Sequence, residues 1–307
     1  MEIQGHTFYM TSNEQERKAN LSVISVGNLV NLKSLYGLQG EVVACFKRTF
    51  YVAISGQLIC FTRSDLFQGP INIITSAPQS IFWSDLGVKE KGKVIITPKL
   101  IYLSSVIFNV SNAAIWAPKK PRLVAHNKVI KKRLKYLEGI KEKSGFESFI
   151  MFKASHNPIA ALEEWLVSCL STSKKSDKPI PCKVSRLLGL GPGLTPSGDD
   201  FLGGIMIALN LIGRRDICRR LWVFILNQPT YLTSKISWTY LNAASQGFSS
   251  VIHNQFLVSI LSAEKNFNLG ELQGFDQIGH TSGWDALLGS IKVLGIWVNL
   301  KKALGHS

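Results

Sequence analysis

The sequence predicts an α+β protein with a β-rich N-terminal barrel or sandwich at residues 1–117 and a mainly helical domain at residues 118–307. Short runs of β-branched and aromatic residues dominate the first third of the chain. The composition changes at the segment Ala-Pro-Lys-Lys-Pro, residues 117–121, and apolar residues recur at helical spacing after it. We therefore expect the strands to precede the helices along the chain.

The β-rich part contains several short segments that are separated by turn residues such as Ser55-Gly56 and Gly69-Pro70. Their spacing favours a small antiparallel barrel or sandwich. The predicted strand segments are residues 42–54, 57–63, 71–75 and 93–104.

The helical part shows its periodicity clearly at Leu162, Trp165, Leu166 and Cys169, which would share one helix face. The predicted helices are residues 129–143, 158–170, 201–212, 216–226, 234–248, 254–263 and 284–302. Residues 171–181 are polar and predict a loop. The helix at 201–212 is apolar on nearly every side, which predicts that it is buried.

The charge of the chain is strongly positive. It has 307 residues, of which 46% are hydrophobic and 18% charged, and a formal net charge of +15. Much of the excess lies in residues 119–143, which form either a solvated linker and helix face or a docking surface for an acidic partner. No zinc-finger spacing or RNA-recognition signature accompanies the charge, so we expect no nucleic-acid partner.

The cysteines and the apolar stretches predict a soluble cytoplasmic protein. Five scattered cysteines without a C-x-x-C pair are typical of reduced thiols. Residues 1–17 lack the pattern of a secretion signal. The longest apolar stretches are interrupted by glycine, Asn210 or Lys292, so we expect no membrane partner.

The most informative motif is the glycine-rich loop Gly-Leu-Gly-Pro-Gly-Leu-Thr-Pro-Ser-Gly-Asp-Asp at residues 189–200. Glycines let the backbone approach a ligand closely, and the buried helix that follows has unpaired N–H groups and a partial positive charge at its start. Ser197 is predicted to cap that helix, and the other N–H groups suit a phosphate or carboxylate. The predicted substrate-binding residues here are Gly191, Gly193, Thr195, Ser197 and Gly198.

Three common motifs do not fit this loop. Gly193 and Gly198 have the glycine spacing of a P-loop, but Asp199 stands where that loop needs lysine. The glycines do not follow the G-x-G-x-x-G pattern of dinucleotide-binding folds. Ser197 lacks the flanking glycines of a G-x-S-x-G nucleophile elbow.

Two adjacent carboxylates, Asp199 and Asp200, fall in the first turn of the predicted helix, and both are candidate catalytic residues. Asp200 could simply cap the helix and interact with its dipole. Asp199 points about 100° away around the helix. It is freer to hold Mg²⁺, a substrate amide or a proton in transfer.

A second copy of this pattern lies near the C-terminus. Residues 197–204 and 282–289 both read Ser-Gly-x-Asp-x-Leu-x-Gly, and both open an apolar helix. Each serine could cap its helix, and the last glycine of each copy permits close helix contact. Either these are two ordinary capped helices, or their N-termini converge on one anionic ligand. The second interpretation adds Ser282 and Gly283 as binding residues and Asp285 as a catalytic candidate.

Two further candidates complete the predicted site. His280 precedes the second copy and could act as an acid or base, although no second histidine or cysteine stands at zinc-ligand spacing. Thr233 and Ser237 lie four residues apart on one helical face and, with Lys235, could bind an anion. The alternative is an ordinary helix cap with local hydrogen bonds.

Three motifs together resemble those of a bacterial family, long described as a domain of unknown function, that includes the AllH-type subunit of oxamate carbamoyltransferase. They are the glycine-rich loop with Phe-Leu after it, Thr-Ser-x-Ile-Ser at 233–237 and Gly-His-Thr-Ser-Gly-Trp-Asp at 279–285. The resemblance covers the C-terminal two-thirds of the chain well and the β-rich part only in general character.

This resemblance implies a subunit that works with two larger partner subunits in allantoin and purine degradation. The assembly would transfer a carbamoyl group between oxalurate and phosphate, with oxamate and carbamoyl phosphate as products. These are small anions, which suit the predicted loop. Asp199 or His280 would move the proton of the amide nitrogen.

Two other functional classes stay open at this stage. The chain could be a non-catalytic regulatory or scaffold subunit that senses a phosphate metabolite. It could also be a stand-alone hydrolase or kinase-like enzyme that uses Mg²⁺ at Asp199 and Asp200; apart from this Mg²⁺, no cofactor is predicted.

Overall fold

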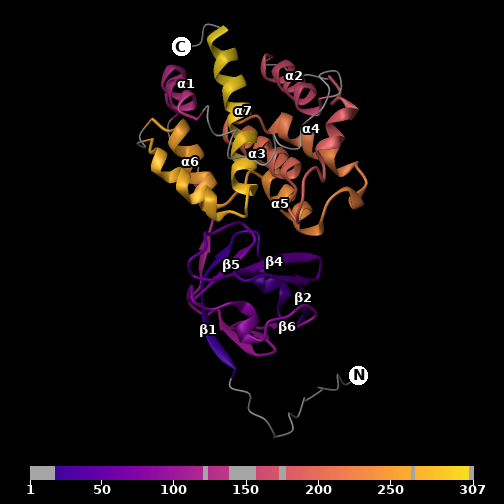
Figure 1. Ribbon diagram of the computed structural model, residues 1–307, viewed down its shortest axis with the longest axis vertical. Coiled ribbons are helices and arrows are strands. Elements are labelled where there is room, and N and C mark those ends of the chain that lie inside the picture. The colour runs from indigo at the N-terminus through magenta and orange to yellow at the C-terminus, as the bar shows by residue number, and fades with distance from the viewer. Residues whose placement is uncertain (1–17, 120–123, 138–156, 173–177, 264–266, 304–307) are drawn as a thin grey trace, which may run out of the picture. The chain divides into compact units, whose positions relative to one another are not determined.

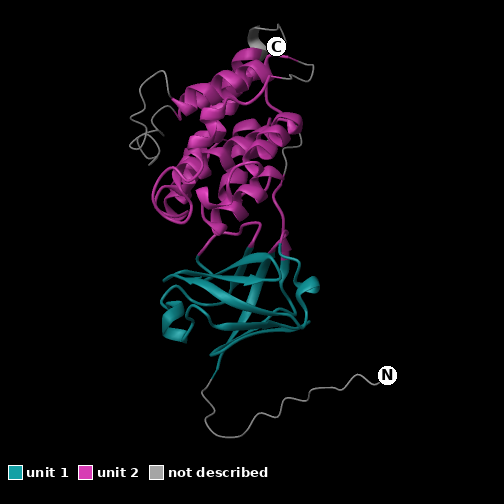
Figure 2. Cartoon of the chain, turned by 90° about the vertical axis from the view of Figure 1, so that its right-hand side faces the viewer, with its two compact units in different colours: residues 1–26, 30–65, 72–114 teal, residues 27–29, 66–71, 115–307 magenta. Residues whose placement is uncertain are grey.

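The computed structural model describes residues 18–119, 124–137, 157–172, 178–263 and 267–303. The chain divides into two compact units (Figure 2). The first contains the chain up to residue 26 together with 30–65 and 72–114, and the second contains 27–29, 66–71 and the chain from 115 onward. The first unit is a β-barrel and the second is helical, which confirms the predicted α+β class.

The barrel has eight strands. They are β1 (Ala19–Gly27), β2 (Gln39–Cys45), β3 (Thr49–Ile54), β4 (Gln57–Thr62), β5 (Asn72–Thr75), β6 (Lys93–Ile96), β7 (Leu100–Leu103) and β8 (Val106–Asn109). The strand order β5-β4-β3-β2-β6-β7-β8-β1 closes because β1 also pairs with β5. The β1–β8 and β4–β5 pairs are parallel and the other pairs are antiparallel. A short strand, β9 (Ala114–Trp116), follows β1 in the sheet order.

Aromatic side chains fill the interior of the barrel. The rings of Phe50 and Phe61 stack with their centroids 4.7 Å apart, and Trp83 meets Phe50 edge to face at 4.8 Å. Phe108 lies 5.2 Å from Phe61. Alternate residues of β3 point inward, as expected for a strand with one buried face. The interior is thus a packed core.

The strand prediction was correct in type but incomplete in detail. The predicted segment 42–54 is a hairpin, because β2 ends at Cys45 and β3 starts at Thr49. Segment 93–104 likewise contains β6 and β7. The sequence did not predict β1, β8 or β9. Two short 3₁₀ helices, η1 (Leu32–Leu35) and η2 (Trp83–Leu86), belong to this unit.

Seven α-helices are described in the second unit. They are α1 (Asn127–Lys135), α2 (Pro158–Leu170), α3 (Ser197–Leu211), α4 (Arg215–Leu226), α5 (Lys235–Ser245), α6 (Val251–Leu261) and α7 (Ser282–Ala303). The 3₁₀ helices η6 (Cys182–Leu187), η7 (Thr230–Leu232) and η8 (Leu269–Gln277) connect some of them. No helix in the described ranges has the length and apolar character needed to cross a membrane.

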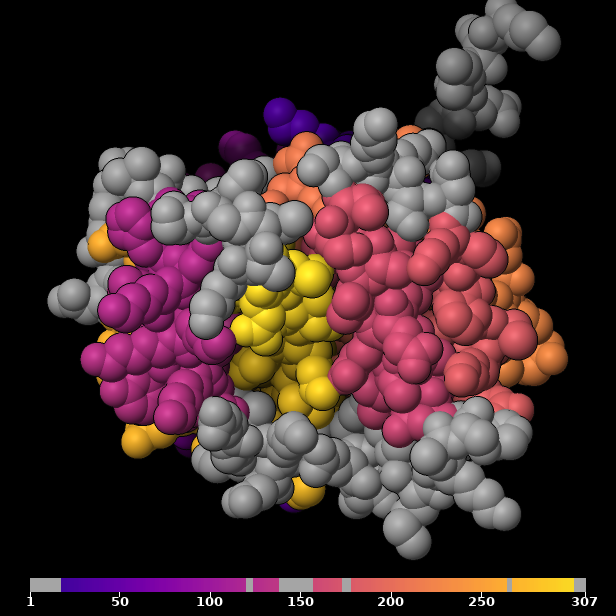
Figure 3. Space-filling view, turned by 90° about the horizontal axis from the view of Figure 1, so that it is seen from above, coloured from indigo at the N-terminus to yellow at the C-terminus, as the bar shows by residue number. Residues whose placement is uncertain are grey.

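Helix α3 is the centre of this unit, as its apolar sequence predicted. Leu202, Met206 and Leu209 are fully buried, and α7, α5 and α4 all contact the helix (Figure 1). Helix α7 crosses α3, and the far part of α7 lies between α1 and α2 (Figure 3). The first turns of α3 and α7 carry the two copies of the repeated motif.

The basic segment at 119–143 lies only partly within the described residues, since 120–123 and 138–143 fall outside them. Helix α1 ends at Lys135, earlier than the predicted end at residue 143. Lys128, Lys131, Lys132 and Lys135 are exposed. Arg133 instead donates to the carbonyls of Ser259, Ile260 and Ser262 at the end of α6, at 2.8–3.0 Å. An acidic partner for the exposed lysines stays a prediction.

Candidate active site at the crossing of two helices

The crossing of α3 and α7 depends on the last glycine of each motif copy. A Cβ atom added to Gly204 would overlap the carbonyl oxygen of Ala286, and one added to Gly289 would overlap that of Phe201. Gly204 and Gly289 hold the eighth position of their copies, and Ala286 and Phe201 hold the fifth. The contact is therefore reciprocal, as at an interface with twofold symmetry. The two copies of the sequence motif therefore make equivalent contacts in the structure.

The starts of the two helices also meet. The hydroxyl of Thr195, just before α3, lies 2.9 Å from the hydroxyl of Ser282, the first residue of α7. The predicted cap of α3 was wrong by one residue, because Pro196 is the N-cap and Ser197 is the first helical residue. Ser197 is buried next to Gly191, where the backbone has a φ of 113°. The aspartates Asp200 and Asp285 are consequently the fourth residues of their helices.

Several of the backbone N–H groups at these helix starts already have partners. The N–H of Gly198 donates to the carbonyl of Leu190 at 2.9 Å, and those of Asp199 and Asp200 donate to the carbonyl of Pro196 at 2.9 and 3.1 Å. At α7, the N–H of Gly283 donates to the carbonyl of Ile278 at 3.1 Å. These N–H groups, which the sequence suggested for binding an anion, are therefore already engaged within the protein.

Asp199 is held by three hydrogen bonds, and we call Asp199, Gly189, Thr233 and Ser237 the Asp199 cluster. The N–H of Gly189 donates to Oδ1 at 2.9 Å, and the Ser237 hydroxyl donates to Oδ2 at 2.6 Å. The Thr233 hydroxyl also donates to Oδ2. Gly189 can approach this closely because it has no Cβ, which would overlap the carbonyl of Leu232. Thr233 and Ser237, which the sequence suggested for binding an anion, thus donate to a carboxyl group of the protein itself.

Burial raises the pKa of Asp199, while the hydrogen bonds from Ser237, Thr233 and Gly189 oppose that rise. The side chain is only 2% exposed. With both oxygens engaged by protein donors, Asp199 fits poorly as a Mg²⁺ ligand. In the described parts of the chain no group of three or more histidine, cysteine, aspartate or glutamate side chains could hold a metal ion. Mg²⁺ at Asp199 and Asp200 stays a prediction that needs a binding measurement.

Asp200 has a different environment from its neighbour, and we call Thr195, Asp200, Ser282 and Asp285 the crossing cluster. The Oδ2 atom of Asp200 is buried and accepts no hydrogen bond from the described residues. Asp285 is fully buried on the facing helix. Burial raises the pKa of Asp200 well above its usual value, and the nearby carboxyls of Asp285 and Asp199 raise it further, against the lowering by the Ser282 and Thr195 hydroxyls.

Three predicted site residues lie apart from these clusters. His280, Lys235 and Gly193 are exposed, and in the described structure none of them has a hydrogen bond to either cluster. Lys235 is the first residue of α5, whose cap is Ser234. Whether any of the three contacts a substrate stays a prediction.

Sequence reasoning missed a buried histidine beside the crossing. Nε2 of His253 on α6 lies 3.0 Å from the hydroxyl of Ser290 on α7, which donates to the carbonyl of Gly204 on α3 at 2.8 Å. Burial lowers the pKa of His253 to about 4, so the ring is neutral at pH 7. A single histidine in an apolar helix has no sequence signal that separates it from an ordinary core residue.

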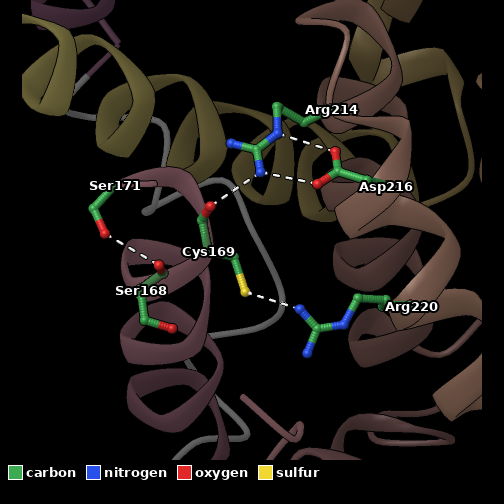
Figure 4. A network of polar contacts seen from close by, with 6 residues as sticks. All are labelled: Ser168, Cys169, Ser171, Arg214, Asp216 and Arg220. Atoms are coloured by element: carbon green, nitrogen blue, oxygen red, sulfur yellow. Dashed lines mark hydrogen bonds and ion pairs between the residues drawn. The ribbon is translucent and has the colours of Figure 1, made fainter. Parts of the chain in front are cut away.

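A second group of polar residues lies where α2 meets α4 (Figure 4), and we call Cys169, Arg214, Asp216 and Arg220 the arginine cluster. Arg214 makes a two-pronged ion pair with Asp216, with N–O distances of 3.0 and 2.9 Å, and also donates to the carbonyl of Cys169 at 3.0 Å. Arg220 donates to the Cys169 sulfur at 3.4 Å. The hydrogen bond from Arg214 lowers the pKa of Asp216.

All five cysteines are free thiols. Cys60, Cys169 and Cys218 are buried, whereas Cys182 is exposed.

A comparison with known protein families gives a match to the part of the chain that contains the α3–α7 crossing. A family model described as oxamate carbamoyltransferase subunit AllH matches residues 187–294, about a third of the chain. The matched range holds the glycine-rich loop, the Thr233–Ser237 segment and both motif copies. The resemblance seen in the sequence is thereby confirmed for this range. No solved structure matches the chain.

Proposed function

We propose that this chain is a subunit of an oxamate carbamoyltransferase-type enzyme, which converts oxalurate and phosphate into oxamate and carbamoyl phosphate. The observation that carries the proposal is the match of the AllH family model to residues 187–294, the range that contains the α3–α7 crossing. The matched range holds a buried carboxyl oxygen, Oδ2 of Asp200, which accepts no hydrogen bond from the described residues. Strongly perturbed carboxyls beside helix starts are a common feature of active sites.

The proposed substrates are small anions, and this limits what the chain can do alone. The groups that shift the pKa of Asp199 and Asp200 are carboxyls, hydroxyls and a backbone amide, and none of them is a basic side chain. Ionised carboxylates repel phosphate and oxamate. We therefore propose that partner subunits supply the cationic groups that hold the anions. The Thr195 and Ser282 hydroxyls, with the exposed loop around Gly193, would contact the substrate from this side.

The test is reconstitution with the other subunits of the enzyme from the same organism. Carbamoyl phosphate formed from oxalurate and phosphate is measured for this chain alone, for the partners alone and for the mixture. We expect activity only in the mixture. Full activity of the partners alone would point to a regulatory or scaffold subunit, and Mg²⁺-dependent activity of the isolated chain would point to a stand-alone enzyme. Either result would contradict the proposal.

A further inference from the structure

We propose that the exposed side of helix α1 is the surface through which this chain binds an acidic surface of a partner subunit. The charge and exposure of this surface are properties of the chain itself. That the partner is a subunit of the same enzyme rests on the proposed function. We call this surface the α1 face, and it consists of Lys128, Val129, Lys131, Lys132, Lys135 and Tyr136, which are all exposed.

The opposite side of α1 fixes the helix to the rest of its unit. Ile130 and Leu137 are buried, and the helix packs against α6 and α7. Just before the helix, the N–H of Ala125 donates to the carbonyl of Leu261 at 2.7 Å. Arg133 donates to three carbonyls at the end of α6. At about 100° per residue, the α1 face lies on the side of the helix opposite Ile130, so these contacts set its position on the unit.

The described neighbours of α1 do not neutralise its lysines. No ion pair joins any of the four lysines of the α1 face to a described residue. Helices α1 and α6 contain no acidic residue, and the only one in α7 is Asp285 in its first turn. Helix α1 instead lies beside the far part of α7 (Figure 3). The positive charge of the α1 face is therefore directed to solvent.

The placement of the lysines is unfavourable for the helix by itself. Lys128 and Lys132 are four residues apart, and so are Lys131 and Lys135. Like charges at this spacing repel each other and destabilise a helix. Lys128 also lies in the first turn, where the partial positive charge of the helix start disfavours a cation and where no acidic residue is present. Carboxylates of a partner would remove this repulsion.

The apolar part of the α1 face favours a protein as the partner. Val129 and Tyr136 are 40% and 59% exposed and lie two turns apart beside the lysines. An exposed tyrosine within a polar rim is typical of protein interfaces. A membrane-binding helix inserts its apolar side, but here that side carries Ile130 and is buried in the protein. Nucleic-acid surfaces favour arginine, whereas Arg133, the only arginine of α1, binds the carbonyls of α6.

The test is the binding of the full chain to the other subunits from the same organism, measured by surface plasmon resonance at several salt concentrations. The α1 variant combines Lys128→Glu with Lys132→Glu. We expect its Kd to be higher by about tenfold or more, mainly through slower association at low salt. The wild-type affinity should fall as salt is added, because salt screens exposed charges. The α1 variant loses like-charge pairs, so its midpoint of thermal unfolding should equal or exceed that of the wild type.

The matched control, the α4 variant, combines Arg215→Glu with Arg219→Glu. It makes the same change in net charge at two exposed positions of α4 that are also four residues apart. It should bind the subunits as the wild type does. Tyr136→Ala should raise the dissociation rate and leave the salt dependence unchanged. A wild-type affinity in the α1 variant, or an equal loss in the α4 variant, would overturn the proposal.

Two further measurements separate this proposal from its alternatives and from the proposed function. A single-stranded oligonucleotide, or vesicles of phosphatidylserine and phosphatidylcholine, could bind the wild type and not the α1 variant. With subunit binding unchanged, that result would assign the α1 face to that ligand instead.

The second measurement is carbamoyl phosphate formation in the mixture of subunits. If the subunits bind through the α1 face but the mixture forms no product, the docking surface stands and the proposed function fails. If the mixture is active and the α1 variant binds and reacts as the wild type does, the function stands and the docking surface fails. A wild-type chain that binds none of the subunits would contradict both.

Discussion

The arginine cluster and the crossing cluster are both polar groups between packed helices, but they shift the pKa of an aspartate in opposite directions. In the arginine cluster, Asp216 is neutralised by the guanidinium of Arg214, and its pKa is lowered. In the crossing cluster, Asp200 faces hydroxyls and other carboxyls, and its pKa is raised. A carboxyl beside an arginine is stabilised in its ionised form, whereas a carboxyl buried among other carboxyls is stabilised in its neutral form.

The Asp199 cluster is intermediate between these two. Its carboxylate has no arginine, yet three donors on two other elements hold it. This arrangement stabilises a charge without a countercharge, and it ties the glycine-rich loop and α5 to α3. The comparison therefore separates two adjacent aspartates: Asp199 accepts three hydrogen bonds, whereas Oδ2 of Asp200 accepts none from the described residues.

The largest expected effect comes from breaking the crossing that brings the carboxyls together. Gly204→Ala would place a methyl group on the Ala286 carbonyl, and no flexible side chain can move to make room. We expect the free energy of unfolding to fall by about 3 kcal/mol or more. The measurement is urea-induced unfolding followed by circular dichroism.

Gly203→Ala is the matched control for that change. A Cβ at Gly203 would lie 3.6 Å from the Cβ of Ala244, an ordinary contact. Replacing a helical glycine with alanine typically stabilises by about 1 kcal/mol, so this variant should be as stable as the wild type or more so. Equal stability of the two variants would show that the helices do not depend on this contact.

The next effect is smaller and changes with pH. His253 has a pKa of about 4 in the folded chain against 6.5 as the ordinary value. The unfolded chain therefore binds the proton first as the pH falls from about 6.5 to 4, and folding stability is lost over that window. The loss should approach about 3 kcal/mol at the lower end.

His253→Gln keeps a donor for the Ser290 hydroxyl but does not titrate. The measured quantity is the difference in unfolding free energy between this variant and the wild type at pH 7 and at pH 4.5. The difference should shift in favour of the variant at the lower pH. A pH-independent difference would mean that His253 is solvated and titrates normally.

The smallest effect tests whether Asp199 belongs with the structural groups. Asp199→Asn removes the charge that Ser237, Thr233 and Gly189 stabilise, and it exchanges an acceptor for a donor. The unfolding free energy should fall by about 2 kcal/mol. Asp200→Asn is the neighbouring control and should not lower it, because a neutral side chain suits that site. The comparison between the clusters fails if the two variants lose stability equally.

Local sequence rules predicted much of the fold. The bounds of α2 agree with the apolar spacing that predicted them, and the starts of the other helices differ by a few residues. The start of α3 was misplaced because Ser197 is a good cap by residue type, whereas the loop puts Pro196 in that position. Strand β1 was missed because its partners β5 and β8 lie far from it along the chain, and short-range patterns do not encode such pairs.

The sequence pointed to the two helix starts and the Thr233–Ser237 segment, but it did not predict the contacts between them. The repeat drew attention to the two helix starts. Thr233 and Ser237 do donate to one carboxyl group, but they do not share a helix face, because Thr233 lies in extended backbone before α5. Which aspartate those hydroxyls would bind depends on how α5 packs against α3, and that is a tertiary property. His253 was not visible for the same reason, since its partner Ser290 lies on another helix.

The reciprocal glycine contacts determine which residues of α3 and α7 can be substituted. The spacing of α3 and α7 at their crossing is set by backbone touching backbone, at Gly204 and Gly289. Side chains elsewhere on α3 and α7, such as Leu209 and Leu294, can therefore be exchanged for others of similar volume without altering the spacing of the helices at this point. The surrounding core is free to diverge in evolution or to be redesigned, while two glycines keep the crossing constant.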